Sequence, residues 1–145
     1  MGWLRKLFGL DAKGSKSFDA ATFVDQFNAG QSRIQEIGSV EGAHYTDYVE
    51  RVKQLKREKR HSEAIQLLVE LVDATEKESR AAGPGWGVAP WYYEQLAIIY
   101  RKEKRYADEV AILERYEAQP KGPGVGPSKL AERLKKARKL ASSES

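Results

Sequence analysis

The chain contains the stretch Leu55-Lys-Arg-Glu-Lys-Arg-His-Ser-Glu-Ala-Ile-Gln-Leu-Leu68 and repeats its pattern 45 residues later as Tyr100-Arg-Lys-Glu-Lys-Arg-Tyr-Ala-Asp-Glu-Val-Ala-Ile-Leu113. The Glu-Lys-Arg triplet is identical in both copies, and three of the apolar positions that follow it are kept or change conservatively. A match at a fixed offset indicates that one supersecondary unit occurs twice in the chain. Neither copy can bury its apolar faces alone, so the two copies are expected to stack on each other.

Each copy has the pattern of a helical hairpin. In the first copy Tyr48, Val52 and Leu55 recur at steps of three and four residues, which makes one apolar stripe along a helix. The charged run 56–60 interrupts this stripe, and a second stripe begins at Ala64. The same order of stripe, charged turn and stripe recurs in the second copy, so each copy predicts two helices joined by a tight turn.

The expected helix ends follow from local residue types. Ser62 is expected to cap the second helix of the first copy, and Pro90 suits the first turn of the next helix because proline needs no amide partner there. Two runs rich in glycine and proline, 81–90 and 120–127, interrupt any helix. The second run leads to a last helix that Ser128 is expected to cap.

The sequence therefore predicts an all-α fold. Near the N-terminus a helix is expected from Ser17 to Ala29, with Gly30 as its C-cap. The expected organisation is a basic amphipathic segment (1–16), an N-terminal helical region (17–42), two helical hairpins (43–120, with the hairpins at 43–80 and 88–120) and a basic C-terminal capping helix (128–145).

Over about Thr46 to Pro120 the chain resembles the tetratricopeptide repeat family. Large residues stand early in the first helix of each copy (Tyr48 and Tyr93), and small ones stand where the two helices cross (Val52 and Ala97). The second helix opens with a small residue in the first copy (Ala64) and has a large packing residue in both copies (Leu68 and Leu113), and a proline closes the second copy (Pro120). The chain departs from the family in its longer period and in Glu109, which stands where a small residue is expected. The resemblance implies an α-α superhelical array of two tetratricopeptide-like hairpins.

The resemblance also implies a ligand groove on the first helix of each hairpin. Carried over by position, the partner-binding residues are Lys53, Lys56, Arg57, Trp91, Glu94, Ile98, Arg101 and Lys102. Most of them are cationic, so the expected partner is a protein or peptide with acidic groups. Trp91 is the aromatic residue that is expected to anchor this partner. The function expected first is a protein-protein interaction or assembly module; the plainer interpretation is that these cations only solvate exposed helices.

Two other interpretations stay open. One is a nucleic-acid-associated protein that uses the two basic turns (56–61 and 101–105) and the basic last helix. In that helix the candidate contacts are Lys129, Arg133, Lys136 and Arg138, although it has no aromatic residue to stack on a base. The first segment pairs apolar and basic residues as interfacial helices do, so Trp3, Leu7 and Phe8 are the candidates for membrane contact.

The tryptophan of the first glycine-rich run is the remaining candidate. Trp86 stands between two glycines, where it either forms an interaction loop or fills the gap between the two hairpins.

The residue types argue against an enzyme. The chain has no cysteine, and its two histidines, His44 and His61, belong to no recognisable catalytic or metal-binding motif. Asp108 and Glu109 are interpreted as charges of a first helical turn. No catalytic residue, metal, cofactor or small-molecule substrate is therefore expected, and the absence of a signal peptide or long apolar run predicts a cytoplasmic protein.

Overall fold

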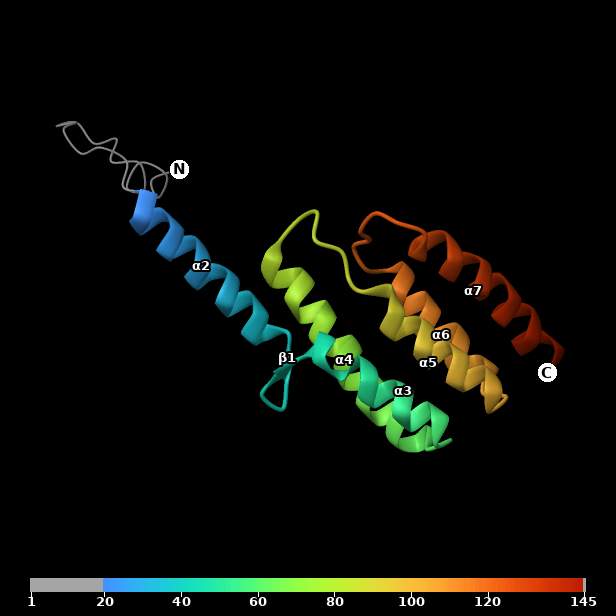
Figure 1. The fold of residues 1–145 in the computed structure, drawn as a ribbon. Coiled ribbons are helices and arrows are strands. Elements are labelled where there is room, and N and C mark those ends of the chain that lie inside the picture. Colours follow the sequence, from blue (N-terminus) through green and yellow to red (C-terminus); the bar gives the residue numbers. More distant parts are fainter. Residues whose placement is uncertain (1–19, 145) are drawn as a thin grey trace. The chain divides into compact units, whose positions relative to one another are not determined.

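The structure is a computed structural model, and it describes residues 20–144 (Figure 1). The chain divides into two units, Met1–Ile34 and Gln35–Ser145, and each is considered by itself. The first described helix, α2, runs from Ala20 to Ile37 and therefore begins in the first unit. It continues through Gly30, so the expectation that Gly30 ends this helix is wrong. A glycine inside a helix weakens it by about 0.5–1 kcal/mol but does not break it.

A small antiparallel hairpin opens the second unit. Its strands are β1 (Ser39–Val40) and β2 (Ala43–His44). Glu41 and Gly42 connect them, and both have positive φ values of 48° and 87°. Two consecutive residues with positive φ are typical of a type I′ turn, which matches the twist of paired strands. The sequence analysis did not predict this hairpin, because two-residue strands leave no alternating pattern.

The rest of the second unit is helical. A short 3-10 helix, η1 (Tyr45–Tyr48), leads into the longer helices α3 (Val49–Arg57), α4 (His61–Ala82), α5 (Pro90–Lys102), α6 (Tyr106–Glu117) and α7 (Gly126–Ser143). Each of these packs on the next one along the chain, and α5 also contacts α7. The predicted all-α fold is confirmed, and α5 begins at the expected Pro90 (Figure 1).

The two copies of the repeat have the same backbone at their turns. Lys59 and Lys104, which are equivalent in the repeat, both adopt φ of 57°. In each copy the amide of the following residue donates to a carbonyl five residues earlier, at 2.9 Å in the first copy and 2.8 Å in the second. The similarity of sequence therefore corresponds to a similarity of local structure, as the repeat predicts.

Neither of the two serines expected as helix caps acts as one. α4 begins one residue before Ser62, and α7 begins two residues before Ser128, whose hydroxyl donates instead to the carbonyl of Val125 at 3.1 Å. At the start of α4, Arg60 occupies the cap position, and its Nε lies 3.0 Å from Oε1 of Glu63. The left-handed turn before α4 determines where this helix begins, and it overrides the local preference for serine.

The core lies between the packed helices from η1 and α3 to α7. Tyr93 and Tyr116 are its largest fully buried side chains, and their ring centroids are 5.1 Å apart. The small residues expected at the helix crossings are fully buried. On one side of the core, Arg115 of α6 forms ion pairs with Asp73 and Glu76 of α4, both at 2.6 Å. These pairs join the second helices of the two hairpins.

The left-handed lysines give a test of the repeated turn. Replacing Lys104 by glycine should raise the free energy of unfolding by about 0.5 kcal/mol, because a side chain at positive φ is strained and glycine is not. Lys59→Gly should behave in the same way. Ala111→Gly, on an exposed position inside α6, is the control and should lower the free energy of unfolding by about 1 kcal/mol. Urea unfolding measures all three, and a loss of stability in both lysine variants would contradict the turn geometry.

Candidate functional site

The predicted groove residues lie on neighbouring helices. Lys53, Lys56 and Arg57 belong to α3, and the predicted residues from Trp91 to Lys102 belong to α5. The two helices are joined directly, because Nζ of Lys56 donates a hydrogen bond to Oε1 of Gln95. Gln95 was not among the predicted groove residues; it is buried and polar and therefore needs such a partner.

The last helix adds a third wall to this site. A hollow of about 190 Å³ lies between α5 and α7. Its lining residues are Glu94 and Arg101 of α5 with Lys129, Glu132, Arg133 and Lys136 of α7. Residues that the sequence analysis assigned to two separate sites, one for protein and one for nucleic acid, therefore line one surface. We call this surface the basic groove and define it by Lys56, Glu94, Arg101, Lys102, Lys129, Arg133 and Lys136.

Like charges crowd in the basic groove. Partial burial lowers the pKa of Lys56, and the neighbouring positive charges of Lys102 and Arg133 lower it further, against the opposing effect of Glu94. Burial also lowers the pKa of Arg133, and Arg101 adds to this shift. Each shift means that the protonated form is disfavoured by its surroundings. A bound anion would relieve that repulsion.

Beneath the groove lies a fully buried carboxylate, Glu109 of α6, which is 0% exposed. Arg101 approaches both of its oxygens, with Nε 3.0 Å from Oε1 and Nη2 2.8 Å from Oε2. On the α7 side, Nε of Arg133 lies 3.0 Å from Oε2, in contact but without an aligned hydrogen bond. We call these three residues the buried triad. Glu109 does belong to the first turn of α6, as expected, but it is buried between two arginines instead of facing solvent.

The triad changes the roles of two predicted site residues. The guanidinium groups of Arg101 and Arg133 neutralise Glu109, and Nη2 of Arg101 also donates to the carbonyl of Arg133 at 3.4 Å. Both arginines therefore hold α5, α6 and α7 together. The one signal that could have revealed this was the charge of Glu109 at a position where the repeat pattern has a small residue.

Other cations of the groove are less engaged. Lys102 and Lys136 are exposed, and within residues 20–144 neither has a carboxylate within ion-pair distance. Lys129 is also largely exposed, but its Nζ lies 2.9 Å from Oε2 of Glu94. Farther along α3, Lys53 is 3.4 Å from Glu50, a pair of exposed side chains that contributes little. Lys102 and Lys136 are thus the cations most available to a ligand.

The apolar part of the predicted groove is partly used by the core. Trp91 is half-buried and packs edge-on against Tyr92, with ring centroids 5.1 Å apart. Ile98 is also half-buried. Only the outer parts of these two side chains are accessible, so they offer a flat apolar contact rather than a deep pocket.

The nucleic-acid candidates do not form a continuous surface. Lys129, Arg133 and Lys136 line the basic groove, whereas Arg138 lies 4.0 Å from Glu114 and borders a different depression. In the charged turns, Arg60 and Arg105 each pair with nearby exposed carboxylates. The membrane candidates Trp3, Leu7 and Phe8 lie outside the described residues.

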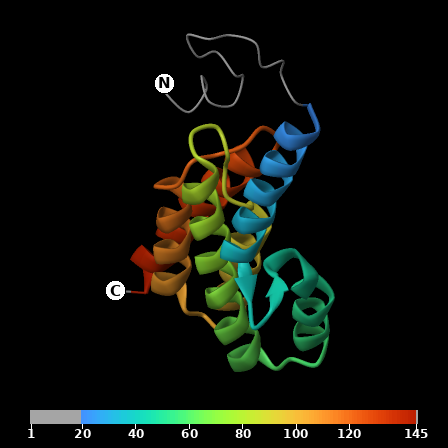
Figure 2. The same ribbon diagram turned by 90° about the vertical axis from the view of Figure 1, so that its left-hand side faces the viewer.

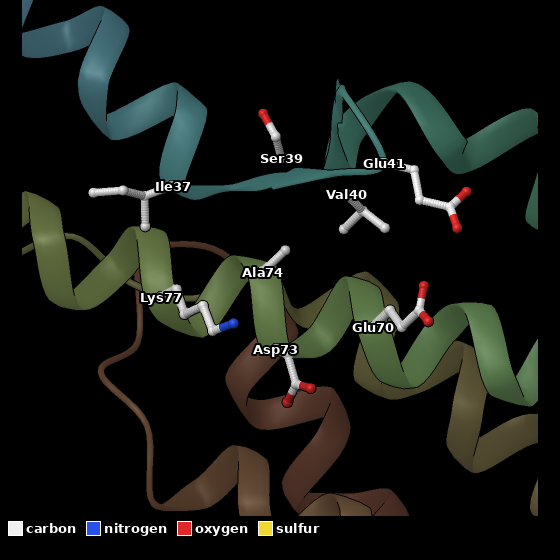
Figure 3. A pocket seen from close by; sticks show the side chains of 8 residues that line it. All are labelled: Ile37, Ser39, Val40, Glu41, Glu70, Asp73, Ala74 and Lys77. Carbon is white, nitrogen blue, oxygen red and sulfur yellow. The ribbon is translucent and has the colours of Figure 1, made fainter.

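A second hollow, of about 290 Å³, lies between the β-hairpin and α4 (Figure 3). Val40 and Ala74 form its floor, and Glu41, Glu70, Asp73 and Lys77 surround them. Asp73 is already paired with Arg115. Its charged groups have both signs, and no histidine, serine triad or other nucleophile arrangement lies among its lining residues.

Both ring nitrogens of His44 contact other side chains. Its Nε2 contacts Oε2 of Glu78, and its Nδ1 lies 2.8 Å from Oγ1 of Thr46. Gly38 packs so close to this pair that an added methyl group would collide with the Glu78 carboxylate. The Nε2 contact therefore holds the β-hairpin on α4, and the Nδ1 contact joins His44 to the first turn of η1.

The part of the chain that the structure describes contains neither a candidate metal site nor a candidate membrane span. Its histidine, aspartate and glutamate side chains form no group of three that could hold a metal ion. None of its helices combines the length and the apolar character needed to cross a bilayer. Comparisons of the chain with family models, with curated proteins and with solved structures gave no match.

The buried triad gives a second prediction. Glu109→Gln should lower the free energy of unfolding by about 3 kcal/mol, because Arg101 and Arg133 would keep their charges without a partner. Glu132→Gln is the control, since its side chain is 71% exposed and its change should stay within about 0.5 kcal/mol. Chemical unfolding followed by circular dichroism compares the two. Equal stabilities of the two variants would show that the triad does not hold the helices together.

Proposed function

We propose that this protein is a non-catalytic, tetratricopeptide-like interaction module that binds an acidic segment of a protein partner in the basic groove. The proposal includes a cytoplasmic location. The observation that carries it is the gathering of cations from α3, α5 and α7 on one surface, where burial first and mutual repulsion second lower the pKa of Lys56 and of Arg133. A surface that serves only solubility has no need to place like charges so close together.

Some charged residues of the groove hold the helices in place and others are free to contact a partner, which supports binding rather than catalysis. The buried triad fixes the relative positions of α5, α6 and α7, so the groove exists before the partner arrives. A preformed surface loses less entropy on binding than a flexible one. Lys102 and Lys136 then supply charge that steers and selects an acidic partner, while the outer faces of Trp91 and Ile98 supply apolar contact.

Nucleic-acid binding, the alternative function, would use the same cations, but the groove lacks the other features that such binding needs. A protein that follows a phosphate backbone needs cations spaced along a track, and single strands also need aromatic platforms. The groove cations are concentrated around one hollow, and Glu94 and Glu132 line it with them. Two carboxylates on the wall suit a peptide that carries both acidic and polar groups better than a uniform polyanion.

Charge reversal at the available cations tests the proposed function. The probe is a short fluorescein-labelled peptide in which aspartate and glutamate flank a pair of apolar residues. Lys102→Glu together with Lys136→Glu should weaken its binding at least about tenfold, because attraction becomes repulsion at the groove. Fluorescence anisotropy titrations at low and high salt measure the dissociation constants.

The matched control is Lys77→Glu together with Arg80→Glu. These changes lower the net charge equally, but they lie on α4 and outside the basic groove. The control should bind the peptide nearly as well as the unchanged protein. Equal weakening in both double variants would show that net charge rather than the groove binds the peptide, and undiminished binding of a peptide with asparagine and glutamine in place of the acids would reject the acidic partner.

A further inference from the structure

A second internal repeat lies in the two glycine-rich loops. Gly83-Pro-Gly-Trp-Gly87 connects α4 to α5, and Gly122-Pro-Gly-Val-Gly126 connects α6 to α7. The two segments share the pattern Gly-Pro-Gly-apolar-Gly, in which Trp86 and Val125 occupy the same position. Both loops lie at the same end of the second unit (Figures 1 and 2).

The two loops contact each other through a backbone hydrogen bond and close packing. The amide of Val88 donates to the carbonyl of Pro120 at 3.0 Å, and Val88 forms a parallel bridge with Lys121. Gly87 packs so close to the other loop that an added Cβ would lie 2.6 Å from the carbonyl carbon of Lys121. A similar contact seats Gly126 on Pro90, where an added Cβ would lie 2.7 Å from its ring. The close packing explains why glycine stands at these positions.

The apolar residues of the two loops remain outside the core. Trp86 is 47% exposed and Val125 is 80% exposed, which places both among the large apolar side chains most open to solvent in residues 20–144. The gap between the hairpins is closed instead by Val88, which is 3% exposed, so the interpretation of Trp86 as a plug is wrong. The carbonyls of Trp86 and Val125 each accept a serine hydroxyl, from Ser79 and from Ser128. The exposed apolar groups are thus carried on a fixed backbone.

The loop segments themselves carry charge of one sign. Residues 79–93 and 118–131 contain no aspartate and no glutamate. They contain three cations, Arg80, Lys121 and Lys129, all of which are exposed, although Lys129 also pairs with Glu94 of α5 at 2.9 Å. An apolar tip with a cationic rim complements a surface that is apolar inside and anionic outside.

We propose that the loop pair around Trp86 and Val125 is a membrane-contact edge, which inserts its two apolar side chains into the interface of a bilayer containing anionic lipids. Tryptophan favours this interface because its ring is amphipathic. Cations close to an anionic leaflet add attraction. A second copy of the chain fits less well as the occupant, because two cationic rims would face each other.

Vesicle binding tests the proposed edge. The full chain is mixed with vesicles of phosphatidylcholine alone or of phosphatidylcholine with phosphatidylserine, and bound protein is measured by flotation. Binding should require the anionic lipid. Trp86→Ser together with Val125→Ser should reduce it about tenfold, since two apolar groups no longer enter the interface. The control is Ile37→Ser, which removes a side chain of similar exposure (44%) from another part of the second unit and should bind as the unchanged chain does.

A spectroscopic arm remains informative even if the double variant folds poorly. Trp3→Phe together with Trp91→Phe leaves Trp86 as the sole tryptophan of the full chain. Its emission should shift to the blue, and its quenching by acrylamide should fall, when anionic vesicles are added. Unchanged emission and quenching would overturn the proposal.

The remaining outcomes also decide the proposal. Full binding by the Trp86 and Val125 double variant would overturn it, and loss of binding on changing Trp3, Leu7 and Phe8 to serine would then assign the contact to the N-terminal segment. Protection of Trp86 that rises with protein concentration and needs no vesicles would assign the edge to self-association instead. Binding of the acidic peptide by the groove is measured separately, so the two proposals fail independently.

Discussion

The contact on which the second unit depends is the buried ion triad of Glu109, Arg101 and Arg133. A carboxylate that is 0% exposed is tolerated only when cations neutralise it. The two cations come from α5 and α7, so the carboxylate of α6 is satisfied only when all three helices are packed together. The narrow apolar stripe of α7 buries Leu130, Leu134 and Ala137 and brings the helix to the core. Charge then determines its position along the neighbouring helices.

The position of α7 creates the basic groove. With Arg133 held against Glu109, the same face of α7 brings Lys129 and Lys136 beside α5. Lys56 reaches this surface from α3 through its hydrogen bond to Gln95. Burial lowers the pKa of Lys56, and the repulsion from Lys102 and Arg133 lowers it further. The packing that stabilises the helices therefore leaves a concentrated positive surface, which is an unfavourable arrangement for the free protein and a favourable one for an anionic partner.

Much of the fold could be predicted from the sequence because it is periodic. The self-match and the three- and four-residue spacing of apolar side chains indicate the hairpins, and Pro90 marks the start of α5. The triad could not be derived in this way, because periodicity shows which face of a helix is buried but not which cation meets which carboxylate. For the same reason the residues of the basic groove were predicted to belong to two separate sites. The start of α4 near Ser62 was missed because the left-handed turn at Lys59, rather than a serine cap, precedes the helix.

The two copies of the repeat differ in a way that explains their different roles. Lys56 and Arg101 occupy equivalent positions, as do Ala64 and Glu109. Where the second copy has a buried carboxylate, its arginine is held by that carboxylate and becomes part of the scaffold. Where the first copy has alanine, the lysine has no equivalent carboxylate as its partner. It donates a hydrogen bond to Gln95 instead and stays in the groove. The change from a small residue to glutamate, together with the change from lysine to arginine, thus separates a structural cation from one that can meet a ligand, in two hairpins that otherwise share their turns.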